Sequence, residues 1–157
     1  MKNLLVYLLI FTTFLSCNAQ DNSFEGDGKV DFIAVSKVPV VEGTINGKQA
    51  FFIVDSGASL SVLDDNQSDY FKFLTSSSNI AAAGYGGVAS FGNASNVKLT
   101  IGGKKFETDF KSQDLSKIVD LIRENDGVEI SGIIGSDIMK DYHFIIDYSE
   151  LTISISN

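Results

Sequence analysis

The dipeptide Asn46-Gly47 restricts the fold of this chain more than any other feature, because it joins two apolar runs. Val38–Ile45 precedes it and Lys48–Val54 follows it. Both positions of a type I′ turn require positive φ, which Asn and Gly adopt readily. The segment therefore predicts an antiparallel hairpin. Pro39 places the first strand at a sheet edge or near its own start, since proline lacks the N–H that a central strand donates.

Further short apolar segments, separated by glycine or polar turns, predict a second hairpin, one more short strand and a closing pair of strands. These segments are Asn96–Ile101, Lys104–Phe110, Ile130–Ile134, Tyr142–Asp147 and Leu151–Ile155. In the last of them, Leu151, Ile153 and Ile155 alternate with Thr and Ser, which predicts a half-buried strand. The predicted fold class is therefore mainly β.

Helical patterns are short. Asp114 is placed to cap a helix with one apolar face, and Asn125 and Gly127 are placed to end it. Ser136–Lys140 suits one or two further helical turns. The apolar helix face comprises Leu115, Ile118, Val119 and Ile122.

Composition excludes several functional classes. The 157 residues suit one domain and carry 20 acidic against 12 basic side chains, a formal net charge of −8. This charge disfavours nucleic acid as a partner, because phosphate binding needs a basic surface. One cysteine excludes an intrachain disulfide framework, and one histidine argues against a histidine metal site or a Ser-His-Asp triad. Asp64, Asp65 and Asp69 are expected in a solvated loop or helix start, and their spacing fits no EF-hand.

Residues 1–20 predict an export signal, and residues 21–36 predict a tether with room for a short strand over Val30–Val35. The apolar run Leu4–Leu15 is too short to span a bilayer. Cleavage after Ala19 would leave an ordinary exported protein. Phe14–Cys17 instead resembles a bacterial lipobox, with Cys17 as the lipid-bearing residue, and we favour this hypothesis. Both interpretations predict an exported protein of the cell envelope, periplasmic, lipid-anchored or secreted, whose residues 37–157 fold.

The strand Lys48–Val54 ends abruptly at Asp55-Ser56-Gly57, so an apolar strand delivers a carboxylate into a tight turn. Phe51–Val54 is continuously apolar, which predicts a strand covered on both faces. Gly57 allows another backbone or a ligand to approach closely. An Asp at a strand end often only forms an Asx-turn, so a functional role for Asp55 needs support from the rest of the chain.

The chain resembles the retropepsin-like, or retroviral-type, aspartic peptidases, and particularly their small bacterial single-domain members. Asp55-Ser56-Gly57-Ala58 matches the family's Asp-Thr/Ser-Gly-Ala loop. Ile133-Ile134-Gly135, about 80 residues later and before a short helix, matches the second signature. The resemblance runs from about Val38 to Ile155 and implies a single-lobe acid-protease β-barrel with one or two short helices.

The resemblance implies peptide-bond hydrolysis by a water that Asp55 activates, without a metal or another cofactor. Two adjacent carboxylates share one proton, so that one acts as base and the other as acid. No second Asp-Ser/Thr-Gly occurs in the chain. The second carboxylate would therefore come from another subunit, in a homodimer with Asp55 of each chain on the twofold axis.

The resemblance also assigns roles to neighbouring residues. Ser56 would brace the two loops, Gly57 would donate its N–H to the dyad, and Ala58 completes the loop. Ile133, Ile134 and Gly135 would support the loop from beneath. Retroviral members carry Arg at the position of Ser136, so the ion pair of that Arg is replaced or absent here.

A glycine-bearing hairpin flap over the cleft is implied within Ile80–Asn96, with an ordinary surface loop as the alternative. Its tip would be Gly84, Tyr85, Gly86 and Gly87, with Tyr85 facing a peptide or protein substrate.

Three hypotheses compete. The first is an exported, dimeric aspartic endopeptidase. The second keeps the fold without catalysis, as an envelope-associated binding or scaffold domain. The third is an unrelated β-domain in which both motifs are coincidental, and it predicts that Asp55 and Gly135 lie far apart.

Overall fold

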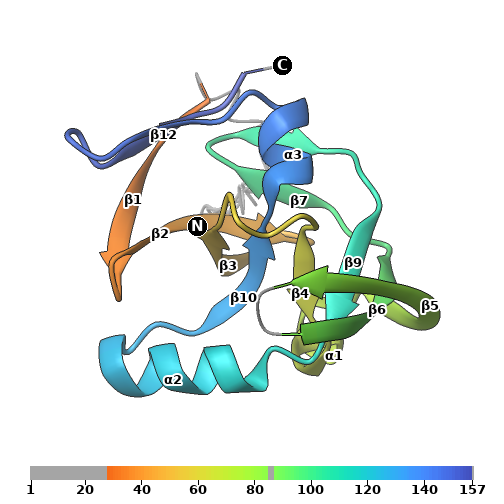
Figure 1. The fold of residues 1–157 in the computed structure, drawn as a ribbon. Helices are drawn as coiled ribbons and strands as arrows, with labels where there is room; N and C mark the ends of the chain where they lie inside the picture. Colours follow the sequence, from red (N-terminus) through yellow and green to blue (C-terminus); the bar gives the residue numbers. More distant parts are fainter. Residues whose placement is uncertain (1–27, 85–86, 157) are drawn as a thin grey trace, which may run out of the picture.

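The computed structural model describes residues 28–84 and 87–156, which form a curled, mainly β domain (Figure 1). Its strands are β1 (Lys29–Val35), β2 (Val38–Ile45), β3 (Lys48–Val54), β4 (Val62–Asp64), β5 (Leu74–Gly84), β6 (Gly87–Ser95), β7 (Leu99–Ile101), β8 (Lys104–Phe106), β9 (Phe110–Gln113), β10 (Ile130–Ile134), β11 (Ile145–Asp147) and β12 (Thr152–Ser154). Its helices are the 3₁₀ turn η1 (Asp65–Gln67), α1 (Ser68–Phe71), α2 (Ser116–Asp126) and α3 (Ser136–Asp141).

The strands follow the order β11-β12-β1-β2-β3-β10-β4-β9-β6-β5, with β7 pairing with β2 and β8. Most neighbouring strands in this order are antiparallel, but β10 pairs parallel with β3, and β9 pairs parallel with β4. A parallel pair needs a long connection between its strands. The chain between β3 and β10 supplies the hairpin β5–β6, the hairpin β7–β8 and helix α2.

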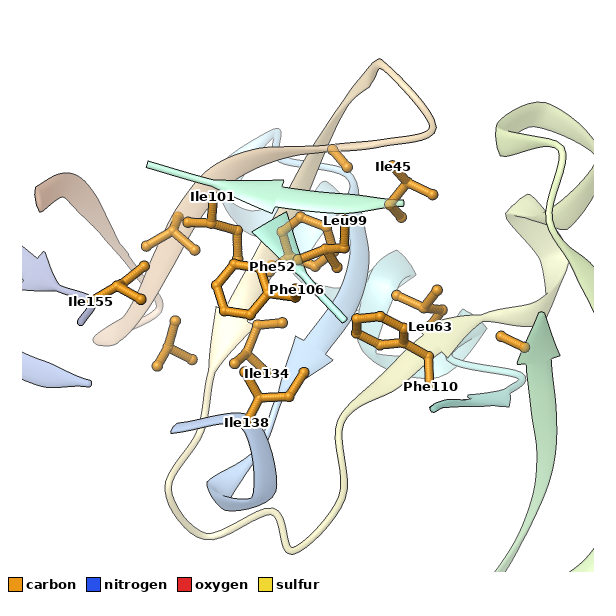
Figure 2. Close-up of a cluster of buried hydrophobic side chains, with 14 of the residues drawn as sticks. Ile45, Phe52, Leu63, Leu99, Ile101, Phe106, Phe110, Ile134, Ile138 and Ile155 are labelled. Atoms are coloured by element: carbon orange, nitrogen blue, oxygen red, sulfur yellow. The ribbon is translucent and has the colours of Figure 1, made fainter. Parts of the chain in front are cut away.

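The sheet encloses two hydrophobic clusters because neighbouring residues of β3 point to opposite faces. Phe52 and Val54 belong to the larger cluster, which Figure 2 shows around Phe52 and Phe106. Ile53 belongs to a smaller cluster that the apolar face of α2 covers through Val119 and other residues. The prediction that β3 is covered on both faces is therefore confirmed.

The β2–β3 hairpin has the predicted turn, with φ of 51° at Asn46 and 79° at Gly47. The Asn46 side-chain amide also binds the segment just before β7. Its Nδ2 donates to the Asn96 carbonyl (2.8 Å), and its Oδ1 accepts from the Lys98 N–H (2.8 Å). Pro39 is the second residue of β2, which lies between β1 and β3. The strand-start interpretation of Pro39 is confirmed, and the edge interpretation is wrong.

The expected tether contributes a strand to the sheet. β1 covers Lys29–Val35 and pairs with both β2 and β12. Phe32 and Val35 are buried, so this segment gains apolar contacts that a tether would lack. The predicted signal, with Cys17, and residues 21–27 of the tether lie outside the described residues.

The later hairpin and the closing strands occur at the predicted places but are shorter. β7 and β8 turn through Gly102 and Gly103, both at positive φ, and β8 ends at Phe106. The alternation predicted for the last strand fails at its start. Leu151 has a φ of 53° in the preceding turn and is 46% exposed, whereas Ile153 and Ile155 are buried.

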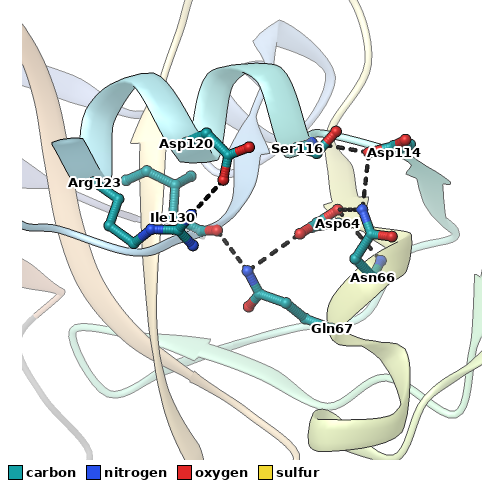
Figure 3. A network of polar contacts seen from close by, with 8 residues as sticks. All are labelled: Asp64, Asn66, Gln67, Asp114, Ser116, Asp120, Arg123 and Ile130. Carbon is teal, nitrogen blue, oxygen red and sulfur yellow. Dashed lines mark hydrogen bonds and ion pairs between the residues drawn. The ribbon is translucent and has the colours of Figure 1, made fainter.

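Asp64 is buried at 2% exposure, so the expectation of a solvated position was wrong. Figure 3 shows the Asp64 carboxylate beside the side-chain amides of Asn66 and Gln67, which donate to it. Its Oδ1 accepts from the Leu115 N–H (3.1 Å) and its Oδ2 accepts from the Gln67 amide (3.2 Å), which also donates to the Ile130 carbonyl (2.8 Å). These bonds satisfy the buried charge and tie β4 to the start of α2.

Leu115, and not Asp114 as predicted, is the N-cap residue of α2, but the Asp114 carboxylate one residue earlier still binds the first N–H of the helix. Its Oδ1 accepts from the Ser116 N–H (2.9 Å) and from the Asn66 amide (2.8 Å). These hydrogen bonds, first from the side chain and backbone of Ser116 and then from Asn66, hold the pKa of Asp114 below its usual value. Gly127 ends the helix at a φ of 71°. Leu115, Val119 and Ile122 are buried, while Ile118 is 39% exposed at the margin of the apolar face.

Replacing Asp64 with alanine should destabilise the fold. The Leu115 N–H and the Gln67 amide would lose an acceptor in a buried place, which costs about 1–3 kcal/mol. Urea unfolding measures the change. Asp69→Ala, at an exposed position of α1, is the matched control and should change the free energy of unfolding by less than about 0.5 kcal/mol. Equal stability of the two variants would contradict the assigned role of Asp64.

The contribution of Asp114 should depend on pH. Because folding lowers its pKa, the carboxylate stabilises the fold above the pKa of the unfolded chain, and this stabilisation is lost as pH falls through the folded pKa. Urea unfolding of the wild type and Asp114→Asn should therefore differ more at about pH 6 than at about pH 3. A difference that grows on acidification would contradict this assignment.

Candidate active site

The turn after β3 holds Asp55 by backbone contacts. The Asp55 N–H donates to the Ile134 carbonyl of β10 (3.0 Å), and the Asp55 carbonyl accepts from the Ala58 N–H (3.1 Å). The Asp55 carboxylate accepts from the Gly57 N–H through Oδ1 (2.8 Å). This N–H is the donor to which the family resemblance assigned a role at the dyad. The bonds give the carboxylate a defined place at the end of a buried strand.

The tip of this turn lies on the surface of the domain. Asp55, Ser56 and Gly57 are exposed, and Ala58 is half-buried. The strand behind them is buried through Val54. The fold therefore presents one carboxylate outward on a rigid support, with its remaining oxygen open to solvent or to another molecule.

The second motif lies directly against the first. β10 is the parallel neighbour of β3, with Ile134 opposite Val54. Beyond it, the Ser136 N–H donates to the Ala58 carbonyl (2.8 Å). A Cβ on Gly135 would come within 2.8 Å of the Leu60 carbonyl carbon and oxygen, so a larger residue would push this backbone apart. This proximity contradicts the third hypothesis, in which Asp55 and Gly135 lie far apart.

The two isoleucines of the second motif face opposite sides of the sheet. Ile134 is completely buried in the larger cluster with Phe52 and Val54. Ile133 is only half-buried and packs against the smaller cluster beside Ile53. Ile134 therefore supports the turn from the core, and Ile133 lies on the same face of the sheet as α2.

The predicted flap is a hairpin in the structure. β5 pairs antiparallel with β6 from Leu74 opposite Ser95 to Gly84 opposite Gly87, with an irregularity between Ser76 and Ile80. β6 also pairs with β9, which anchors the base of the hairpin to the rest of the sheet beside β4 (Figure 1). Tyr85 and Gly86 lie outside the described residues.

Two residues that the sequence analysis did not select connect the motifs. Ser61, just before β4, and Asp137, in α3, hydrogen-bond to each other. The signal that both residues offered is position: each lies within six residues of a motif glycine or of Asp55.

Comparison with protein families places residues 41–138 in the family described as aspartyl protease. The chain belongs to the aspartyl protease family. Solved structures show that its fold is retropepsin-like. No curated protein sequence matches the chain.

Three of the similar structures illustrate this fold. The protease of EIAV, complexed with the inhibitor HBY-793, is 21% identical, with a TM-score of 0.51 over 69% of this chain and 91% of that one. The retroviral protease-like domain of Ddi1 from Leishmania major is 19% identical, with a TM-score of 0.51 over 76% and 89%. A retropepsin-like aspartic protease from Rickettsia conorii is 18% identical, with a TM-score of 0.52 over 82% and 89%.

These comparisons confirm the predicted fold class, a mainly β retropepsin-like domain with a few short helices. Within residues 28–84 and 87–156, no three His, Cys, Asp or Glu side chains gather closely enough to hold a metal ion. In the same part of the chain, no helix has the length and apolar character needed to cross a membrane.

Proposed function

We propose that this protein is an aspartic endopeptidase that hydrolyses peptide bonds with a water activated by Asp55. One observation carries the proposal: in an aspartyl protease domain, the Asp55 carboxylate projects from a turn that its backbone bond to Ile134 and the Gly57 N–H hold in place. A family member with this turn intact retains the group on which the chemistry depends.

The proposed active form is a homodimer. One carboxylate cannot act as both base and acid toward the same water, and the sequence contains a single Asp-Ser-Gly-Ala loop. The exposure of Asp55, Ser56 and Gly57 leaves room for the same turn of a second subunit. A twofold axis beside Asp55 would bring the two carboxylates together.

In this dimer, the two Asp55 side chains share one proton, because two like charges so close cannot both ionise. The ionised carboxylate takes a proton from the water, whose oxygen attacks the scissile carbonyl carbon. The protonated carboxyl hydrogen-bonds the carbonyl oxygen and stabilises its developing charge. Proton transfer to the amide nitrogen then lets the C–N bond break, which yields a carboxylic acid and an amine.

The neighbouring residues complete the proposed site. Ser56 braces the two turns across the axis, while Gly57 and Ala58 shape each turn. The hairpin β5–β6 closes over the bound peptide, with the glycines at its tip allowing movement. The N-terminal pattern supports export, with Cys17 as the favoured point of attachment to lipid.

Replacing Asp55 with asparagine should abolish hydrolysis without harming the fold. The variant loses the charge that takes the proton from water, so cleavage of labelled casein should fall by at least about 10²-fold. Its free energy of unfolding should stay within about 0.5 kcal/mol of wild type, because asparagine keeps the Oδ1 that accepts from the Gly57 N–H. Asp109→Asn, at an exposed loop position, is the matched control and should cleave normally.

Full activity of Asp55→Asn would refute the proposed mechanism. A wild-type protein that folds and dimerises but cleaves no peptide would favour the second hypothesis, a binding or scaffold domain with the same fold.

A further inference from the structure

A serine and an aspartate outside both family motifs hold those motifs together. Ser61 lies at the end of the Asp55 loop and is 2% exposed. Its N–H donates to Asp137 Oδ2 (2.9 Å), and its hydroxyl donates to Asp137 Oδ1 (2.6 Å). Both oxygens of one carboxylate therefore bind one residue, through its backbone and its side chain.

The Ser61 hydroxyl also serves the second motif. Its Oγ accepts from the Gly135 N–H at 2.9 Å, so the bonds run from the Gly135 N–H through Ser61 Oγ to Asp137 Oδ1. Asp137 Oδ1 further accepts from the Ile138 N–H (2.8 Å). Each group has a partner, which matters because an unpaired polar group in this buried place would be unfavourable. Charge-assisted bonds of this kind are short and directional, and they reinforce one another in a chain.

The loop from Asp55 to Ser61 depends on these bonds for its position. Most of its residues are exposed or half-buried, including Asp55, Gly57 and Ser59, so packing in the core does not hold them. The loop is held by the Asp55 N–H on Ile134 at one end and by Ser61 on Asp137 at the other. Between these points, the Ser136 N–H holds the Ala58 carbonyl.

We infer that Asp137, acting through Ser61, is a positioning residue that holds the Asp55 turn against the start of α3. The inference rests on the proposed peptidase function and adds to it the residue that orients its carboxylate. Asp137 directly follows Ser136, the position at which the family resemblance calls for an arginine. The Asp137 carboxylate connects the two motifs by accepting from Ser61.

Loss of the Asp137 bonds should lower turnover much more than it weakens substrate binding. Asp137 contacts neither Asp55 nor the exposed tip of the turn in the bonds described, so its loss shifts the carboxylate and leaves the cleft walls in place. A displacement of about 1 Å at a reacting group lowers the rate by about 10²-fold. The value of kcat should fall by this order, while KM changes by less than about threefold.

The test compares five variants of the full chain on labelled casein: Asp137→Ala, Asp137→Asn, Ser61→Ala, Ser61→Thr and Asp141→Asn. Loss of the bonds in Asp137→Ala and Ser61→Ala should lower kcat by about 10²-fold. Asp137→Asn keeps one acceptor and should lie between these variants and wild type. Ser61→Thr keeps the hydroxyl and should recover most of the activity. Asp141→Asn, exposed on the same helix, is the control and should match wild type.

Amide hydrogen exchange supplies a readout that needs no catalysis. In Ser61→Ala the Gly135 N–H loses its acceptor, and in Asp137→Ala the Ser61 N–H loses its own, so each amide should exchange faster. If the alanine variants do not fold, Asp137→Asn replaces them, because it keeps only one of the two acceptors and should still speed exchange of the Ser61 N–H. Ser61→Thr, which keeps the hydroxyl, should leave exchange of the Gly135 N–H unchanged.

Unchanged kcat in Asp137→Ala and Ser61→Ala, with an active wild type, would overturn the inference and leave the proposed function standing. A loss of kcat that Ser61→Thr does not recover would also overturn it. If wild type cleaves no casein, the proposed function fails, and exchange alone decides. Faster exchange of the amides from Asp55 to Ala58 in Asp137→Ala would then support positioning of the turn, and unchanged exchange would refute it.

Discussion

The parallel pairing of β3 with β10 is the interaction on which the rest of the structure depends. It sets Ile133 opposite Ile53 and Ile134 opposite Val54, so both strands end at the same edge of the sheet. Asp55 and Gly135 are the next residues of the two strands, and the Asp55 N–H extends the pairing to the Ile134 carbonyl. The candidate active site is therefore the shared end of two buried parallel strands.

The alternation of β3 gives this pair its support on both faces. Phe52 and Val54 pack into the larger cluster with Ile134, and Ile53 packs into the smaller cluster beneath α2. A shift of β3 by one residue would exchange the two faces and turn the Asp55 side chain to the other side. Burial of both faces thus fixes where the carboxylate emerges, although the carboxylate itself is exposed.

Local chemistry made part of this arrangement predictable. The hairpin at Asn46-Gly47 was predictable because few residues accept positive φ at both turn positions. Asp55 and Gly135 were found through motifs that matched a family, and the family comparison confirmed that membership. The parallel pairing of strands about 80 residues apart was not predicted, since the residues of a strand do not show which other strand it pairs with. The burial of Asp64 and the Ser61–Asp137 bonds escaped prediction for the same reason: their partners are distant in sequence.

The central claim is that two subunits each supply one Asp55 to a single site. The most direct test mixes wild-type protein with increasing amounts of Asp55→Asn under conditions that allow subunits to exchange, and measures peptide cleavage per wild-type subunit. A shared site predicts that this specific activity falls toward zero as mixed dimers replace wild-type dimers. Specific activity that stays constant at every mixing ratio would contradict the account, because each subunit would then hold a complete site of its own.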